Sequence, residues 1–230
     1  MEAGTVSVEG GRGREADPLK LRERAYESFI EGLLAREFVP GQFLSQRQLV
    51  ARTGLPLGAI REIIPRLESE GLLTTVPQRG IQIAHVDLNL IREAFQFRLF
   101  LEKEAVALFT VSASDAVLAE LRREHEDMLA LAEQRVLTKE EEARAQAIDW
   151  HLHDTFVDAL GNGIISLAYR VNSVKLRLIN QDRYRIDGRV QPVMREHLKV
   201  IEAIESRDPQ KASQMIAEHI DSARRLALNV

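Results

Sequence analysis

The chain has no cysteine, which excludes disulfide bonds and thiolate metal ligands and is consistent with a reducing compartment. Aromatic residues are few, at 5%, while hydrophobic residues reach 45%, a composition that favours helices. No apolar run approaches the ~18 residues that a membrane span needs, and the N-terminus lacks the apolar core of a signal peptide. The net charge of -4 argues against extensive coating of nucleic acid. We therefore expect a cytoplasmic protein that does not contact a membrane.

The 230 residues suffice for one large or two ordinary domains. Residues 18–84 carry nine Lys or Arg against seven Asp or Glu, whereas residues 85–230 carry twenty against twenty-four. This asymmetry is too small to decide a function by itself. Residues 1–17 are rich in Gly, Glu and Arg and lack apolar anchors, so we expect a flexible tail there.

Three helices are predicted after the tail. The apolar residues of the first recur with the period of an amphipathic helix, which Pro40-Gly41 must end. Ser45 and Gln48 have the spacing of a capping box and open a short second helix that Gly54 closes. A third helix, with isoleucines at helical spacing, ends at Gly71.

Two short strands are predicted next, over residues 72–76 and 81–84, joined by a turn that carries Arg79. Helices followed by a hairpin with a cationic tip are the layout of a winged helix-turn-helix. In that layout the third helix enters the major groove of DNA, and the hairpin reaches the neighbouring backbone or minor groove. The alternative is a compact interaction domain with the same elements and no contact with DNA.

The pattern is helical from Asp87 to the end of the chain. N-caps and turns divide it into six helices at Asp87, Ser114, Thr138, Gly161-Asn162-Gly163, Asp187-Gly188 and Asp208-Pro209. In the first of these helices, the residues predicted to face the core form an apolar stripe: Ile91, Phe95, Leu99, Leu101, Ala105 and Leu108. The predicted fold is mainly α, with a winged helix-turn-helix over residues 18–84 followed by an antiparallel all-α helical bundle over residues 87–228.

A candidate metal site lies in the bundle. Asp149 and His153 stand four residues apart, so they project from one face of a helix, one turn apart. His197 and His219 stand roughly ten residues before and after the turn at Asp208, which gives them similar heights on an antiparallel hairpin. One aspartate and three histidines form a plausible shell for zinc, nickel or manganese. The alternative is that His153 is a hydrogen-bonded core histidine and Asp149 a solvated acid.

Several segments of the first domain share a known pattern: Val39-Pro40-Gly41, Leu44-Ser45, Arg61-Glu62, Leu67–Leu72 and Pro77–Gly80. Together they resemble the DNA-binding domain of the GntR family of transcriptional regulators. The resemblance implies that Arg47, Arg61, Arg79 and Gly80 contact operator DNA.

Two features of the third helix depart from the family pattern. Pro56-Leu57-Gly58-Ala59 opens the helix without a side-chain donor for phosphate or base. Pro65 stands inside the helix, where it removes one hydrogen bond and is expected to bend the axis. These departures leave the arginines with a large share of DNA binding.

The second domain also carries shared motifs: Asp149–His153, Gly161-Asn162, Glu196-His197, Ala203-Ile204, Asp208 and His219. They resemble the C-terminal domain of the FadR subfamily, called FCD, in its six-helix VanR-like type. The resemblance implies a divalent metal ion held by Asp149, His153, His197 and His219.

The resemblance also implies that Arg98 faces the cavity and pairs with a small organic acid effector. The alternative for Arg98 is a solvated side chain on a helix flank. Asn172, on the helix after Gly163, is a further pocket candidate. His85, His125 and His151 have no partner at ligand spacing and are predicted to lie on the surface.

The favoured function is a ligand-responsive transcriptional repressor or activator that binds double-stranded operator DNA as a homodimer. A small carboxylate at the metal site is expected to control the binding. One alternative is a metal-dependent hydrolase or lyase in a helical bundle, but the sequence has no Glu-x-x-His pair of a di-iron bundle and no His-Glu-x-x-His motif. Another alternative is a regulator whose metal is purely structural. We expect no enzymatic activity.

Overall fold

The computed structural model describes residues 18–183 and 189–228, which divide into two compact units. One unit holds the described residues up to Glu37 together with Phe43–Gln82, and the other holds Phe38–Gln42 and the residues from Ile83 onward. The predicted tail over residues 1–17 and the predicted turn at Asp187-Gly188 lie outside the described residues. Within the described ranges, none of the helices combines the length and the apolar character needed to span a bilayer.

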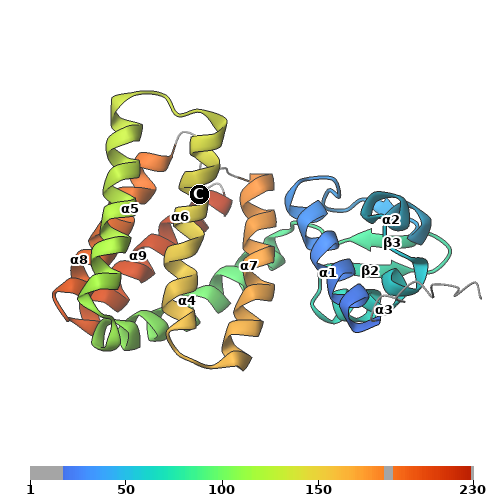
Figure 1. Cartoon of the computed structure of the whole chain (residues 1–230), viewed down its shortest axis with the longest axis horizontal. Coiled ribbons are helices and arrows are strands. Elements are labelled where there is room, and N and C mark those ends of the chain that lie inside the picture. The colour runs from blue at the N-terminus through green and yellow to red at the C-terminus, as the bar shows by residue number, and fades with distance from the viewer. Residues whose placement is uncertain (1–17, 184–188, 229–230) are drawn as a thin grey trace, which may run out of the picture. The chain divides into compact units, whose positions relative to one another are not determined.

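The N-terminal unit is a winged helix-turn-helix (Figure 1). Its elements are α1 (Pro18–Leu34), β1 (Phe43–Leu44), α2 (Gln46–Thr53), α3 (Leu57–Ser69), β2 (Leu73–Val76) and β3 (Gly80–Ile83). The strand order is β1-β3-β2, with β1 antiparallel to β3. β1 was not predicted, because two residues are too few to show a strand period. α1 ends before Pro40-Gly41 because Arg36 adopts a left-handed conformation, φ 62°, which does not continue a helix.

Local signals account for the ends of α2. The hydroxyl of Ser45 accepts the Gln48 N–H at 3.2 Å, and Gln48 Oε1 accepts the Ser45 N–H at 2.8 Å, which confirms the capping box. Gly54 closes the helix with φ 68°, and its N–H donates to the Val50 carbonyl. α3 continues through Pro65 to its last residue, with the proline on the exposed face.

Six helices form the described part of the C-terminal unit, which confirms the predicted bundle. They are α4 (Leu88–Ser112), α5 (Asp115–Gln134), α6 (Lys139–Asp158), α7 (Gly163–Arg183), α8 (Val190–Glu205) and α9 (Pro209–Leu228). α4 packs mainly against α9, α5 against α8, and α8 against α9, while α6 and α7 also contact α4 (Figure 1). The predicted N-caps accept backbone amides at Asp87, Ser114, Thr138 and Asp208.

The buried face of α4 differs from the prediction. Ile91 is buried as expected, whereas Leu108 is 52% exposed and does not belong to the core. The buried face instead includes Arg98 and Glu102, at 3% and 0% exposure. The predicted stripe is thus correct at Ile91, Phe95 and Ala105, which are buried, and wrong at Leu108. Because an apolar pattern discounts charged residues, it also missed Arg98 and Glu102.

Candidate metal centre and nucleic-acid interface

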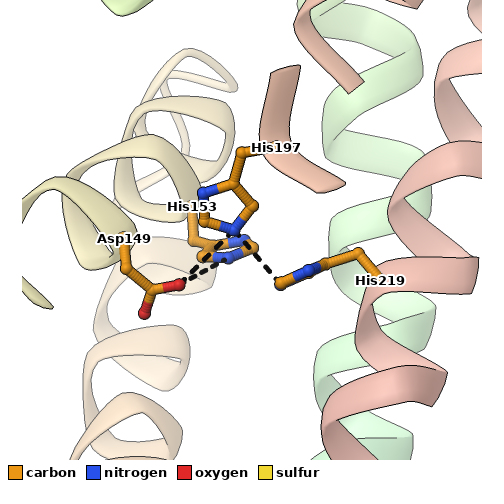
Figure 2. A group of neighbouring side chains, drawn as sticks. All are labelled: Asp149, His153, His197 and His219. Atoms are coloured by element: carbon orange, nitrogen blue, oxygen red, sulfur yellow. Dashed lines mark hydrogen bonds and ion pairs between the residues drawn. The ribbon is translucent and has the colours of Figure 1, made fainter. Parts of the chain in front are cut away.

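Asp149 and His153 on α6, His197 on α8 and His219 on α9 converge inside the helical unit (Figure 2). One potential ligand atom from each residue lies within 4.8 Å of all the others. All four residues are buried, and His153 and His197 are at 0% exposure. His197 Nε2 lies 3.4 Å from Asp149 Oδ1 and 3.3 Å from His219 Nε2. The structure thus brings together the four residues that the sequence proposed as ligands.

His125 of α5 orients the ring of His197. Its Nδ1 lies 2.7 Å from the Leu121 carbonyl oxygen, which only accepts, so the Nδ1–H donates this bond. Burial lowers the pKa of His125, so the ring is neutral and carries a lone pair on Nε2. That nitrogen lies 3.1 Å from His197 Nδ1 and accepts its N–H. With its proton on Nδ1, a neutral His197 presents the lone pair of Nε2 to the cluster.

Glu196 of α8 orients His219. Its Oε2 accepts the His219 Nδ1–H at 2.9 Å, and its Oε1 accepts the Ser222 hydroxyl at 3.1 Å. Burial lowers the pKa of His219 despite this bond, and it lowers the pKa of His197 further, so both rings are neutral. The lone pairs of the two Nε2 atoms then face each other across 3.3 Å. Two facing lone pairs repel, and a cation bound by both nitrogens removes that repulsion.

Glu102 of α4 orients His153. Its Oε2 accepts the His153 Nδ1–H at 2.7 Å, and its Oε1 accepts Arg98 Nε at 2.8 Å and the Tyr169 hydroxyl at 2.7 Å. Burial raises the pKa of Glu102, but the charge of Arg98 and the hydrogen bonds from His153 and Tyr169 outweigh burial and hold the pKa well below its usual range. An ionised Glu102 keeps the ring proton on Nδ1, so the other nitrogen of His153 faces the cluster.

The chemistry of this donor set fits a divalent cation. Three imidazole nitrogens and one carboxylate oxygen are ligands that zinc, nickel and manganese accept. Each of the three histidines donates its single ring N–H, at Nδ1, to a separate acceptor, as metal-binding histidines almost always do. Asp149 is also held in place, because Gln146 Nε2 donates to its Oδ2 at 3.1 Å. The cluster is therefore a candidate metal centre.

The two predicted effector residues occupy different positions. Arg98 is buried, not solvated on a helix flank, and its Nη2 lies 2.5 Å from His153 Nε2. Its guanidinium therefore touches the nitrogen that the proposed metal would bind. Asn172 of α7 is 7% exposed, and its Nδ2 donates to the Ala94 carbonyl at 3.1 Å, which fastens α7 to α4.

The prediction that His125 lies on the surface is wrong, because the residue is at 0% exposure. A signal was present, since His125 falls in helical phase with the buried apolar residues of α5, which include Leu118, Leu121 and Met128. His85 and His151 are exposed, as predicted. The sequence assigned no role to Glu102 or Glu196, because an acidic residue on a helix rich in charges is predicted to be solvated unless its buried partner is known.

The predicted DNA-contacting arginines are all exposed: Arg47 on α2, Arg61 on α3 and Arg79 between β2 and β3. Arg61 Nε donates to Gln46 Oε1 at 3.0 Å. The guanidinium carbon of Arg79 lies 4.1 Å from the centroid of the Phe43 ring, a cation–π contact. Both contacts restrict the side chains before any DNA arrives, and the DNA contacts themselves stay predictions.

The backbone at the base of the wing requires a glycine at position 80. Its φ is 96°, and a Cβ there would lie 2.7 Å from the Leu44 carbonyl oxygen. A side chain would therefore separate β1 from β3. At the start of α3, Pro56 makes no side-chain capping bond and Leu57 is 37% exposed, so this helix end presents apolar groups.

A winged helix-turn-helix followed by an all-α unit is the architecture of a two-domain DNA-binding regulator. The chain belongs to the GntR family of bacterial regulatory proteins and carries an FCD domain. Residues 21–83 match the model described as bacterial regulatory proteins, gntR family, and residues 93–222 match the FCD domain.

Known relatives agree with this assignment. The chain is 26% identical over 187 residues to the uncharacterized HTH-type transcriptional regulator YdhC of Bacillus subtilis, covering 80% of each chain. It is 25% identical over 209 residues to the HTH-type transcriptional repressor GlaR of Escherichia coli, covering 85% of this chain and 90% of that one. A GntR regulator from Rhodococcus sp. RHA1 shares the fold, with a TM-score of 0.71 at 17% identity over 93% of this chain and 98% of that one. The protein is a DNA-binding transcriptional regulator, not an enzyme.

Proposed function

We propose that a small carboxylate controls the operator binding of this regulator, and that it binds at a divalent metal held by Asp149, His153, His197 and His219. The observation that carries the proposal is the set of three buried imidazoles, each with its Nδ1–H donated to its own acceptor. This leaves three Nε2 atoms and one carboxylate oxygen converging within 4.8 Å. The guanidinium of Arg98 lies 2.5 Å from His153 Nε2, at the edge of this convergence, but the lone pairs of His197 and His219 face each other across 3.3 Å and favour a further cation.

Arg98 supports the effector half of the proposal. A divalent cation with coordination positions left open would accept carboxylate oxygens from a small acid. Arg98 adds a guanidinium at the edge of the same cluster, 2.5 Å from His153 Nε2, where it can donate to an anion. Glu102 holds Arg98 Nε at 2.8 Å, so the direction of the guanidinium is set before the effector binds. Asn172 is a further candidate for the pocket.

We propose that the protein acts as a homodimer in the cytoplasm. Helix-turn-helix proteins commonly bind an operator as dimers, in which each subunit contacts one of two half-sites. Arg47, Arg61, Arg79 and the backbone at Gly80 are the proposed DNA contacts. Effector binding would shift the population of dimers whose DNA-binding units match both half-sites. The name of GlaR, a transcriptional repressor, supports repression as the sign of control.

Calorimetry of a panel of small organic acids against metal-free, zinc-loaded and DNA-bound protein tests the proposal. The effector is expected to bind the zinc-loaded protein, to lose affinity in chelator, and to regain it with added zinc. By reciprocity, an effector that weakens DNA binding must bind the DNA-bound dimer more weakly, by roughly 5–150-fold. Equal binding to the metal-free protein would show that the metal is structural and that Arg98 and its neighbours form the pocket alone.

A further inference from the structure

A buried hydroxyl on α7 has no hydrogen-bond partner among the described residues. Ser173 is 3% exposed, and its Oγ is the unpaired atom. Hydroxyls inside helices commonly donate back to the carbonyl four residues earlier, as Thr110 and Thr155 do in this protein at 2.7 Å each. Ser173 does not use that acceptor. Because a buried hydroxyl without a partner is unfavourable, this one is available to a bound group.

Arg177 lies one turn further along the same face of α7. Its guanidinium carbon lies 4.9 Å from the centroid of the Trp150 ring, a cation–π contact. The ring covers the guanidinium but accepts no bond from Nε, which is buried and has no hydrogen-bond partner in the described ranges. Burial lowers the pKa of Arg177, which means that the charged form is destabilised and that a bound anion would stabilise it.

Two acids act on the charge of Arg177 without pairing with it. Asp154 is occupied by Arg170, whose Nη1 lies 2.5 Å from Asp154 Oδ1. Asp149 is occupied by the metal centre, because its Oδ1 lies 3.4 Å from His197 Nε2. No ion pair joins Arg177 to an acid in the part of the chain that the structure describes. The guanidinium thus retains donors for an acid that the protein itself does not supply.

The face of α7 that carries these two groups runs beside the metal centre. α7 packs against α4 and α6, the helices that support and supply ligands (Figure 1). At one end of this face, Tyr169 donates to Glu102, the acceptor of a ligand histidine. At the other end, Arg177 covers Trp150, which directly follows the ligand Asp149 in the sequence. A small molecule bound at the centre can therefore extend toward α7.

We propose that Ser173 and Arg177 form a second anion subsite, which binds the distal carboxylate of a small dicarboxylic acid. The hydroxyl of Ser173 and the Nε–H of Arg177 donate to this carboxylate, while the first carboxylate binds at the metal centre beside Arg98. The two residues then select a diacid over a monoacid of the same length. This inference rests on the proposed function, because it takes the metal centre as the site of the first carboxylate.

Calorimetry of the zinc-loaded full chain with paired acids tests the subsite. Malonate, succinate, glutarate and adipate are each compared with the straight-chain monoacid of equal carbon number. We expect at least one diacid to bind about tenfold or more tightly than its monoacid, since it gains a charge-assisted hydrogen bond. Equal affinity within every pair would overturn the subsite and leave a carboxylate at the metal. A lack of binding by all the acids would overturn the proposed function together with the subsite.

Variants assign the diacid advantage to residues. Arg177→Gln is expected to abolish it and to leave the monoacid affinity unchanged. Ser173→Ala removes only an unpaired hydroxyl, so it is expected to fold and to lose about 3–10-fold of the advantage. Arg170→Gln on the same helix is the matched control, because Arg170 pairs with Asp154 and Asp158. Circular dichroism checks the folding of each variant.

A diacid can also gain affinity by chelating the metal with both carboxylates. That advantage would survive Arg177→Gln and Ser173→Ala at full size, and this outcome would overturn the proposal. If Arg177→Gln does not fold, an unchanged advantage in Ser173→Ala overturns it alone. The comparison between diacid and monoacid is made on the same zinc-loaded variant, so a change in metal content does not imitate the loss.

Trp150 provides a second readout, because it is the single tryptophan of the chain. Its emission reports the contact with the guanidinium of Arg177. Saturation of the zinc-loaded protein with the favoured diacid is expected to change this emission, since the second carboxylate draws the guanidinium from the ring, whereas the monoacid leaves the contact in place. A diacid that binds with its full advantage and changes the emission no more than its monoacid would place the second carboxylate away from Arg177.

Discussion

His125 Nε2 accepts the Nδ1–H of His197 at 3.1 Å, so a neutral imidazole orients one of the candidate metal ligands. The other two ligand histidines are oriented by carboxylates, Glu102 and Glu196. His125 can serve as the acceptor only because its own Nδ1–H is donated to a backbone carbonyl. The tautomer of His197 is therefore set by a residue that does not touch the proposed ion.

We expect His125→Leu to weaken zinc binding by about 10–100-fold, the usual effect of losing a partner that orients a metal ligand. His125→Gln is expected to retain most of the affinity, because its amide oxygen can accept the His197 Nδ1–H. Competition with a chromophoric chelator measures both constants. His151→Leu is the control, since its side chain is 57% exposed. Wild-type affinity in His125→Leu would show that the imidazole pair has no part in metal binding.

His153→Ala, His197→Ala and His219→Ala are each expected to remove most of the bound metal, because each breaks a shell of four ligands. His151→Ala is expected to keep its metal. Metal content of the purified variants, measured by atomic emission, decides the matter. Equal losses in the His151 and His153 variants would contradict the proposed ligand face of α6.

Arg98→Gln is expected to separate effector binding from metal binding. The substitution removes the guanidinium beside His153 Nε2, so carboxylate affinity should fall by at least about tenfold, the loss of one charge-assisted hydrogen bond. The zinc content should persist, because Arg98 is not itself a ligand. Calorimetry with zinc-loaded protein, together with metal analysis, measures both effects. An unchanged carboxylate affinity would remove Arg98 from the pocket.

The stability of the metal-free protein is expected to fall as the solution is acidified. Burial lowers the pKa of His125, His197 and His219 from the ordinary 6.5, so the unfolded chain binds protons that the folded chain refuses. Their contribution is complete above about pH 6.5 and is lost below it, by up to about 1.4 kcal/mol per pH unit for each histidine. Urea unfolding in chelator between about pH 7.5 and about pH 5.5 measures the slope. If the free energy of unfolding does not change with pH, or rises as the pH falls, the three histidines are not neutral in the folded protein.

Arg61→Ala and Arg79→Ala are expected to weaken operator binding and to flatten its salt dependence. Each phosphate contact that is lost reduces the slope of log K against log salt by about 0.9. Both arginines are held by intramolecular contacts, to Gln46 and to Phe43, so their loss should not be replaced by neighbouring side chains. Arg144→Ala, an exposed change on α6, is the control. Unchanged affinity and slope in both variants would mean that α3 and the wing do not meet DNA as proposed.

The sequence by itself determined the parts of this protein that depend on neighbouring residues in the chain. Capping residues such as Ser45 and Thr138, and breaks such as Gly54, act on the backbone within a few residues, so the helices were predictable. The pairing of Asp149 with His153 is of the same kind, because four residues always make one helical turn.

Only the tertiary structure decided how the faces of the helices are turned. Glu102 and His125 point inward and Leu108 points outward, although their residue types predict the reverse. A buried acid is stable only if other residues supply a compensating charge and hydrogen bonds, as Arg98 on the same helix and His153 on α6 do for Glu102. The metal centre likewise depends on the packing of α6, α8 and α9, which side-chain volumes throughout the core determine and local periodicity does not.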